Sequence, residues 1–575
     1  MKFKTTDYFR GVQPKNGFKT FIFVVFMALF EVAGIASIMP FIGFLGNSDD
    51  FIDNTFVITL TELSPFKNDI FYISAAQTLG TFSLLIITIT LLIRSYTTYK
   101  LNIFIENTRH MLSTGLMEDY LNVSYKYIIN SNSSLVSKAI LSEVDQYIAQ
   151  VFRPLILMGA YTIVALFILF FLILYNWQIT LFVFTVFGLS YTVVYKLIKN
   201  LLYKLGMQSV STNESRFSIA SEVTTGIKAV KIFGSEDFFN NAYYKASENF
   251  AKAQAGKQSA TVLPNDFIEF LVFGGTIISI LIYILYFSSG NSDQINNIFA
   301  PLTVFALAAY RLKPALFNIF VGITSIQFGN AILTSLTNLT TALKSNKVNA
   351  FKRQDPIKFA SVKIKNLTFR YNNSLQPVLN NLELEIKKGD FLGIIGHSGS
   401  GKSTLVDILI GLLEPESAVR TIDGLETDAN NRNWRSLFGY VPQDIYILDE
   451  DFYSNVAFGE EKNEIDRDRV IDSCKKANLH NFITSGKNGY DASLGERGVR
   501  ISGGQRQRLG IARALYFDPK ILILDEGTSA LDEKTEEEIL NGLHSLKDSI
   551  SIIMITHKAS TLKFCDKVIE LKTTL

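Results

Sequence analysis

Long apolar runs crowd about the first 330 residues of the 575-residue chain, and they constrain its fold more than any other feature. A bilayer core needs about 20 apolar helical residues to be crossed. The mean hydropathy of +0.22 and the hydrophobic share of 48% are high for a soluble protein. The pattern predicts a membrane half followed by a soluble half. Candidate spans cover approximately residues 18–46, 73–93, 155–175, 179–198 and 267–287, and a sixth begins near 298.

Charges beside these runs predict their orientation. Before the first run, lysine and arginine outnumber the single acid Asp7, so the N-terminus is expected in the cytoplasm. The segment 47–69 is acidic, which places it outside. Only Asn176, Trp177 and Gln178 separate spans three and four, so a tight external hairpin is expected there. Six spans with both ends inside follow from this count.

Two cytoplasmic segments, 100–150 and 199–263, are too long to be loops in a compact domain. Apolar residues recur at helical spacing in 215–234, which favours long helices that continue out of the bilayer. The alternative is an independent soluble insert.

Four charged residues lie inside the candidate spans, where charge is costly and is treated first as a functional hypothesis. They are Glu31, Glu269, Arg311 and Lys313. The alternative is that each lies near a membrane surface or pairs with a neighbouring helix.

Beyond residue 340 the sequence becomes polar and basic, which sets the predicted domains at 1–345 and 346–575. The second contains the strand-like run 391–395 followed by GHSGSGKST. This fits the phosphate-loop pattern through Gly396, Gly401, Lys402 and Ser403. Glycines allow backbone N–H groups to face phosphate oxygens, and the next helix adds its positive dipole end. A glycine-rich turn without a ligand is the alternative.

Two further buried-strand patterns end in polar residues. The run 521–524 is followed by Asp525 and Glu526. A carboxylate at this position can hold the hydration shell of Mg²⁺, and a second one beside it can polarise an attacking water. The run 552–555 is followed by Thr556 and His557, whose imidazole suits a γ-phosphate. Taken alone, His557 is more often explained as a histidine at a strand end. Tyr371 ends an alternating strand pattern and suits stacking on a nucleotide base.

Together, five elements resemble the nucleotide-binding domain of an ABC transporter. They are the phosphate loop, Gln443 after YVP, ISGGQ at 501–505, ILILDEGTSALD at 521–532, and His557. The membrane half similarly resembles a six-span, exporter-type domain, so the resemblance covers essentially the whole chain. The implied fold is an all-α transmembrane domain of six helices followed by an α/β P-loop NTPase domain.

The resemblance implies ATP and Mg²⁺ as cofactors and a role for each matching residue. Tyr371 would stack on adenine, and Glu526 would be the catalytic base. Gln443 would sense the γ-phosphate and contact the membrane domain. His557 would be the switch histidine, Glu496 would lie in an exporter-specific cross-talk loop, and Ser403, Gln443 and Asp525 would bind Mg²⁺. The implied ATP-contacting residues are Tyr371, Gly396, Ser398, Gly399, Gly401, Lys402, Ser403, Thr404, Ser502, Gly503, Gly504, Gln505 and Asp532.

The resemblance also implies an assembly, because in this family the loop of one domain and the signature of another enclose each ATP. One loop and one signature per chain therefore predict a homodimer with two working sites. Ile501 and Gly527 stand where the family usually has Leu and Ala. ATP-driven closure would reorient the membrane cavity by alternating access, through coupling segments expected at 125–132 and 220–227.

The spans resemble those of bacterial flippases of lipid-linked oligosaccharides, which predicts such a cargo and a place in the bacterial inner membrane. Arg311 and Lys313 would suit its diphosphate. Span five departs from the pattern, with Asn265 and Asp266 where a basic residue is expected. The alternatives are a lipid A or phospholipid flippase, a peptide exporter and a drug exporter.

Other classes of protein fit less well. A net charge of +2 argues against a nucleic-acid partner. Six apolar spans exclude a soluble DNA-maintenance ATPase. A damaged Glu526 or signature would favour an ATP-gated channel or regulator, and neither is seen in this sequence. Cys474 and Cys565 lack C-x-x-C spacing and are expected to be buried thiols.

Overall fold

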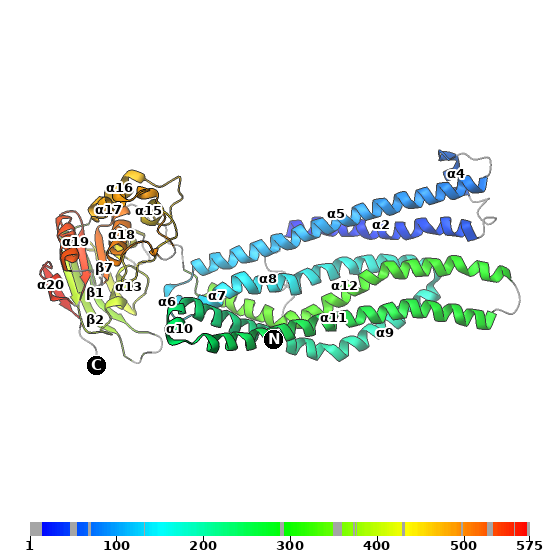
Figure 1. Ribbon diagram of the computed structural model, residues 1–575, viewed down its shortest axis with the longest axis horizontal. Helices are drawn as coiled ribbons and strands as arrows, with labels where there is room; N and C mark the ends of the chain where they lie inside the picture. Colours follow the sequence, from blue (N-terminus) through cyan, green and yellow to red (C-terminus); the bar gives the residue numbers. More distant parts are fainter. Residues whose placement is uncertain are drawn as a thin grey trace. The chain divides into compact units, whose positions relative to one another are not determined.

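The computed structural model divides into two compact units (Figure 1). One comprises Met1–Val123 and Ser131–Lys347; the other comprises Ser124–Asn130 and Val348–Leu575. The structure describes residues 14–46, 55–66, 71–131, 133–287, 292–348, 359–371, 374, 376–427, 432–495, 498–525, 533–556 and 558–571.

The first unit is built from helices, as predicted, and its longest helices extend far beyond a bilayer thickness. α5 has 51 residues, α11 has 52 and α12 has 54, whereas about 20 suffice to span the bilayer core. This confirms long helices over an independent insert. The helices are α2 (Pro14–Gly46), α4 (Thr55–Leu63), α5 (Phe71–Leu121), α7 (Ser133–Lys138), η1 (Ala139–Glu143), α8 (Val144–Tyr147), η2 (Ile148–Phe152), α9 (Arg153–Thr225), α10 (Ile227–Phe233), α11 (Glu236–Phe287) and α12 (Ser292–Ser345).

Within the described residues, four helical stretches are long and apolar enough to cross a membrane. They are Gly17–Leu45, Phe71–Leu121, Val136–Tyr175 and Ala308–Ser345. They match the predicted spans one, two, three and six. The predicted spans 179–198 and 267–287 lie in α9 and α11, in stretches that include side chains outside the described residues.

The chain reverses direction inside α9, although helical backbone continues without a break (Figure 1). Asn213 near its end donates from Nδ2 to Ser142 Oγ of η1 at 3.1 Å. A straight helix would separate these residues by about 100 Å. The reversal agrees with the hairpin expected at 176–178, but no separate loop forms there.

Glycines allow α12 to approach α9 and η2 closely. A Cβ on Gly206 of α9 would lie 2.2 Å from the backbone oxygen of Phe328. A Cβ on Gly322 of α12 would lie 2.4 Å from Met158, and one on Gly329 2.0 Å from Val151. Small residues of this kind are typical of membrane helix contacts.

The two expected coupling segments differ in outcome. At the first, α6 (Tyr125–Ile129) is a separate short helix, and it belongs to the second unit. At the second, α9 continues to Thr225 and a short helix, α10, follows it, so the coupling role of 220–227 stays a prediction. Gly226 leaves helical geometry at φ −98° and ψ 18°, and Gly234 ends α10 at φ 61°. The glycines, not the apolar spacing, therefore set its bounds.

The second unit has the predicted α/β architecture. A four-stranded sheet has the order β2-β1-β4-β5, and its paired strands are antiparallel. A five-stranded parallel sheet has the order β6-β7-β8-β3-β9. The strands are β1 (Ser361–Phe369), β2 (Leu379–Lys387), β3 (Phe391–Ile395), β4 (Ser417–Ile422), β5 (Leu425–Glu426), β6 (Phe438–Val441), β7 (Ile521–Asp525), β8 (Ser551–Ile555) and β9 (Lys567–Glu570).

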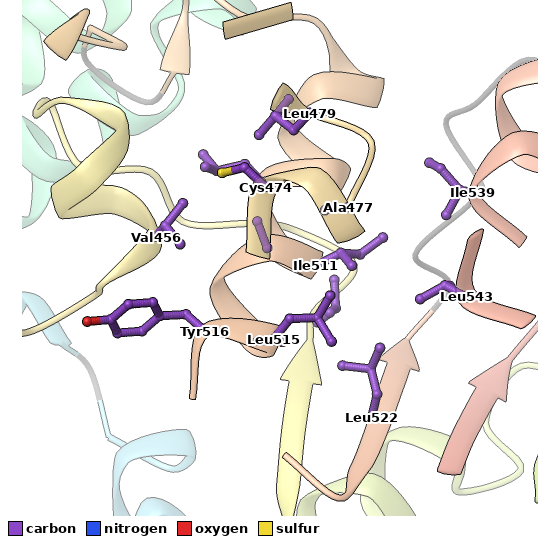
Figure 2. Packing of buried hydrophobic residues seen from close by; sticks show 14 of the residues in the cluster. Val456, Cys474, Ala477, Leu479, Ile511, Leu515, Tyr516, Leu522, Ile539 and Leu543 are labelled. Atoms are coloured by element: carbon purple, nitrogen blue, oxygen red, sulfur yellow. The ribbon is translucent and has the colours of Figure 1, made fainter. Parts of the chain in front are cut away.

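Helices surround this parallel sheet and divide its core in two. One cluster joins the antiparallel sheet, α13 and one face of β3, β7 and β8. The other joins the opposite face to the helices around Cys474, and Figure 2 shows Leu522 of β7 beneath Leu515 and Leu543. The helices are α13 (Lys402–Leu409), α14 (Arg432–Ser436), α15 (Phe452–Val456), α16 (Arg467–Lys476), α17 (His480–Ser485), η3 (Gly489–Asp491), α18 (Gly503–Tyr516), α19 (Glu533–Ser545) and α20 (Ala559–Leu562).

Both cysteines are withdrawn from solvent, as expected. Cys474 is buried and Cys565 is partly buried. Burial raises the pKa of Cys474 to about 12 and that of Cys565 to about 11.

Candidate nucleotide-binding site

The parallel sheet brings three predicted segments to one edge. Register pairs Ile555 of β8 with Ile394 of β3 on one side and with Asp525 of β7 on the other. The phosphate loop, Asp525 and Thr556 therefore follow the carboxyl ends of neighbouring strands. With about 4.8 Å between strands, Asp525 lies roughly 10 Å across the sheet from the phosphate-loop strand. Ligands of open α/β sheets bind at this edge.

Two glycines give the phosphate loop its path. Gly396 has φ +157°, and a Cβ there would lie 2.5 Å from Ser400 Oγ and 2.7 Å from the carbonyl oxygen of Leu571. Gly401 has φ +91° and precedes α13, and a Cβ there would lie 2.9 Å from Val378. Side chains other than hydrogen would therefore displace the loop at both positions.

The loop has the donors that an anion needs. Lys402 is 8% exposed, and its Nζ donates to the carbonyl oxygens of Gly396 at 2.7 Å and His397 at 3.0 Å. Ser403 is exposed at the first turn of α13, as are Ser398 and Gly399 in the loop. Ser400 Oγ is buried without a hydrogen-bond partner in the described part of the chain. A bound phosphate would give these groups acceptors.

Tyr371 lies beside the phosphate loop. Its hydroxyl is 3.0 Å from Thr404 Oγ1 in α13, and its ring makes an edge contact with Phe369. The structure thus brings together two predicted nucleotide-contacting residues, one just after β1 and one in α13. Its stacking on adenine stays a prediction.

Asp525 is held by a neighbour that the sequence did not single out. Tyr440, at the end of β6, donates its hydroxyl to Asp525 Oδ2 at 3.2 Å. Burial, followed by the negative charge of Asp525, raises the pKa of Tyr440, so the hydroxyl keeps its proton at neutral pH. Burial and Asp525 also raise the pKa of Asp407 in α13 to about 6. A cation at Asp525 would relieve this concentration of negative charge.

Helix α6 reaches the same neighbourhood. Tyr125 packs against the cluster that contains α13. Its pKa is raised by burial, followed by the charge of Asp407 and an interaction with Tyr371. Tyr125 therefore lies close enough to Tyr371 and Asp407 to interact with them electrostatically. Tyr440 was missed because it comes near Asp525 only when β6 pairs with β7, far away in sequence, and Asp407 because it does so only through the packing of α13.

The signature begins a second helix with an open N-terminus. Ser502 is exposed and caps α18: its Oγ accepts from the Gln505 backbone N–H at 3.3 Å, and Gln505 Oε1 accepts from Ser502 N–H at 2.8 Å. Gly503 and Gly504 form the first turn. This capping box leaves the helix dipole facing outward, where an anion is favoured.

Of the remaining predicted nucleotide-site residues, the structure describes only Gln443. Gln443 is exposed after β6. Glu526, Asp532, His557 and the cross-talk residue Glu496 lie outside the described residues, as does Gly527.

The four charged residues of the spans pair with one another. Arg311 Nη1 lies 3.0 Å from Glu31 Oε2, and Arg94 lies 3.8 Å from the other oxygen of Glu31. Lys313 Nζ lies 2.6 Å from Glu269 Oε2. The structure therefore favours the alternative in which these charges bridge helices.

Comparison with known proteins agrees with this geometry. A family described as "ABC transporter" matches residues 379–529, and one described as "ABC transporter transmembrane region" matches residues 17–310. The fold is similar to that of a bacterial Atm1-family ABC exporter solved with ATP bound. The TM-score is 0.76 at 21% identity, over 97% of this chain and 94% of that one.

Curated relatives share part of the sequence. The chain is 39% identical over 253 residues to the leukotoxin translocation ATP-binding protein LktB of Mannheimia glucosida, covering 44% of this chain and 34% of that protein. It is 40% identical over 212 residues to the alpha-hemolysin translocation ATP-binding protein HlyB of Proteus vulgaris, covering 37% and 30% respectively. The chain thus spans about a third of the length of these relatives.

Proposed function

The chain belongs to the ABC transporter family, and from that premise we propose that it hydrolyses ATP to drive export of a polypeptide across the bacterial inner membrane. One observation carries the ATPase part: the phosphate loop and Asp525 meet at one edge of the parallel sheet. The long apolar helices supply the membrane part.

The chain's own residues have distinct tasks in this proposal. Lys402 exchanges its two carbonyl partners for phosphate oxygens, and Tyr371 supplies an aromatic face for the base. Tyr440 fixes the orientation of the Asp525 carboxylate. The donor set suits Mg²⁺, which prefers oxygen ligands: Ser403, Asp525 and Gln443 would hold it, and it would neutralise phosphate charge. Glu526 would take a proton from the attacking water.

A second copy of the chain completes each site in our proposal. Ser502 caps an exposed helix N-terminus whose helix packs in a different core cluster from the phosphate loop. The phosphate-facing ends of α13 and α18 therefore need a partner to oppose them. A homodimer supplies two such sites with the least additional assumption.

Polypeptide cargo is favoured over lipid-linked saccharide by two findings. The relatives named above are translocators of protein toxins. Arg311 and Lys313, which would have bound a diphosphate, are already paired with Glu31 and Glu269. The cluster of Glu31, Arg94 and Arg311 retains one net positive charge, which is small for a diphosphate. Lipid A, phospholipid and drug export remain outcomes of the same assay.

The test uses the full-length protein in proteoliposomes. ATP hydrolysis and transport are measured with unfolded polypeptides, lipid-pyrophosphate saccharides, lipid A, a phospholipid and hydrophobic drugs. We expect stimulation by polypeptides and loss of both activities in Glu526→Gln. Stimulation by a lipid alone would refute the cargo, and undiminished hydrolysis in Glu526→Gln would refute the assigned base.

A further inference from the structure

A polar cavity of about 470 Å³ lies between α9 and α12. Its volume is within the range of ligand pockets, roughly 300–1,000 Å³. Tyr195, Lys199 and Tyr203 recur every fourth residue, so they share one face of α9. The cavity is lined by Tyr195, Lys199, Asn200, Tyr203, Lys204 and Gln327.

A hydrogen bond joins two of the lining residues across the cavity, and two lysines give the lining a positive charge. Gln327 Nε2 donates to Tyr195 Oη at 3.0 Å, which joins the α12 wall to the α9 wall. Lys199 and Lys204 are exposed. Neither lysine has a carboxylate within ion-pair distance among the residues that the structure describes. Residues 195–207 contain three lysines and no acid, so the charge is not balanced locally.

The depth of the cavity indicates where its ligand comes from. The predicted fourth span ends at Ile198, and Lys204 lies six residues beyond it, about 9 Å along a helix. Gln327 hydrogen-bonds to Tyr195, three residues inside that span, so this end of the cavity lies nearer the membrane. The headgroup layer is only about 5–8 Å thick on each side. Tyr195 lies inside the predicted span and Lys199 one residue beyond it, so the cavity extends from the headgroup layer at Lys199 to cytoplasmic water at Lys204.

We propose that this cavity binds an acidic segment of the polypeptide cargo before transport. Lys199 and Lys204 would pair with carboxylates, and the amide side chains of Asn200 and Gln327 would hydrogen-bond to peptide groups. The tyrosine rings provide apolar surface between them. The inference rests on the proposed polypeptide export and adds a preference for negative charge.

Binding is measured with the full-length protein in phosphatidylcholine nanodiscs without nucleotide. The probes are a short fluorescent peptide with several glutamates and its counterpart with glutamine in their place. Wild type should bind the acidic peptide at least tenfold more tightly, and Lys199→Ala with Lys204→Ala should remove about that factor. Lys199→Arg with Lys204→Arg should retain it. Equal affinity for both peptides in wild type would overturn the inference.

Lys196→Ala is the matched control, because Lys196 is an exposed lysine on the same helix that does not line the cavity. It should bind as wild type does; a loss equal to that of the double variant would show a diffuse charge effect and overturn the site. Phosphatidylglycerol in the nanodisc should leave peptide affinity within about twofold. Strong competition would assign the cavity to lipid headgroups instead.

Transport separates this inference from the function on which it rests. If both peptides are exported equally, polypeptide export stands and the acidic preference is overturned. If neither peptide stimulates ATP hydrolysis while a lipid-pyrophosphate saccharide does, the proposed cargo fails.

Discussion

At the residue scale, the buried carboxylate of Glu31 makes the sharpest energetic prediction. Its side chain is 8% exposed and faces Arg311 at 3.0 Å. Without Arg311, Glu31 keeps only the more distant Arg94 at 3.8 Å, and breaking a buried pair costs about 3 kcal/mol. Arg311→Met should therefore lower thermal stability, and adding Glu31→Gln should restore most of it.

Thermal unfolding in nanodiscs, followed by intrinsic fluorescence, measures both variants. If Arg311→Met kept its stability but lost stimulation by cargo, Arg311 would be a cargo contact and the pairing would not be structural.

Lys257 gives a pH-dependent prediction. It lies in α11 before the predicted fifth span, with Nζ 4.8 Å from the Phe328 ring centre, and burial lowers its pKa to about 8. The unfolded chain binds more protons between pH 8 and the ordinary value of 10.5, so stability should rise with pH across that window. Below pH 8 the penalty is fully present.

Lys257→Met removes this titration. The variant should unfold at a higher temperature than wild type at pH 7, and the difference should shrink at about pH 9.5. A difference independent of pH would mean that packing, not desolvation of the ammonium, sets the effect.

At the scale of elements, the approach of α9 to α12 depends on glycine. A Cβ on Gly206 would meet backbone of Phe328, which cannot rotate away as a side chain would. Gly206→Ala should therefore destabilise the protein by about 2 kcal/mol through overpacking. A Cβ on Gly159, in the same helix, would meet no atom within 4 Å, so Gly159→Ala should be neutral or stabilising by up to about 1 kcal/mol. Chemical unfolding of the two variants side by side tests the contact; equal effects would contradict it.

Several elements were predictable because their signal is local. The strands β3, β7 and β8 are continuous apolar runs, as expected of buried parallel strands. The bounds of α10 could not be predicted, because the apolar spacing continues through Gly226 although the backbone leaves helical geometry at that residue. The pairing of Lys313 with Glu269, 44 residues apart, likewise depends on how two helices pack.

At the scale of the whole molecule, composite ATP sites predict complementation between inactive copies. Lys402→Ala damages every phosphate loop in its homodimer. Ser502→Asp keeps an N-cap residue on α18 but places negative charge against phosphate. Both homodimers should be nearly inactive.

Mixed dimers distinguish ATP sites shared between two chains from sites completed within one chain. In a dimer of Lys402→Ala with Ser502→Asp, one site carries both defects and the other carries none. ATPase activity should therefore reappear when the two are co-expressed and purified through different affinity tags. Activity that stays at the level of the separate homodimers would mean that each chain completes its own site.

The placement of α6 has a consequence for synthesis of the protein. This helix, Tyr125–Ile129, packs in the unit whose remaining residues begin at Val348. A ribosome that has just made Ile129 must add roughly 440 more residues, which takes about 20 to 90 seconds at 5–20 residues per second. During that time the later helices enter the membrane, and the core cluster against which Tyr125 packs has not yet been synthesised. The nucleotide-binding unit therefore cannot complete its core from its own continuous stretch of chain, because one of its helices was made long before the rest.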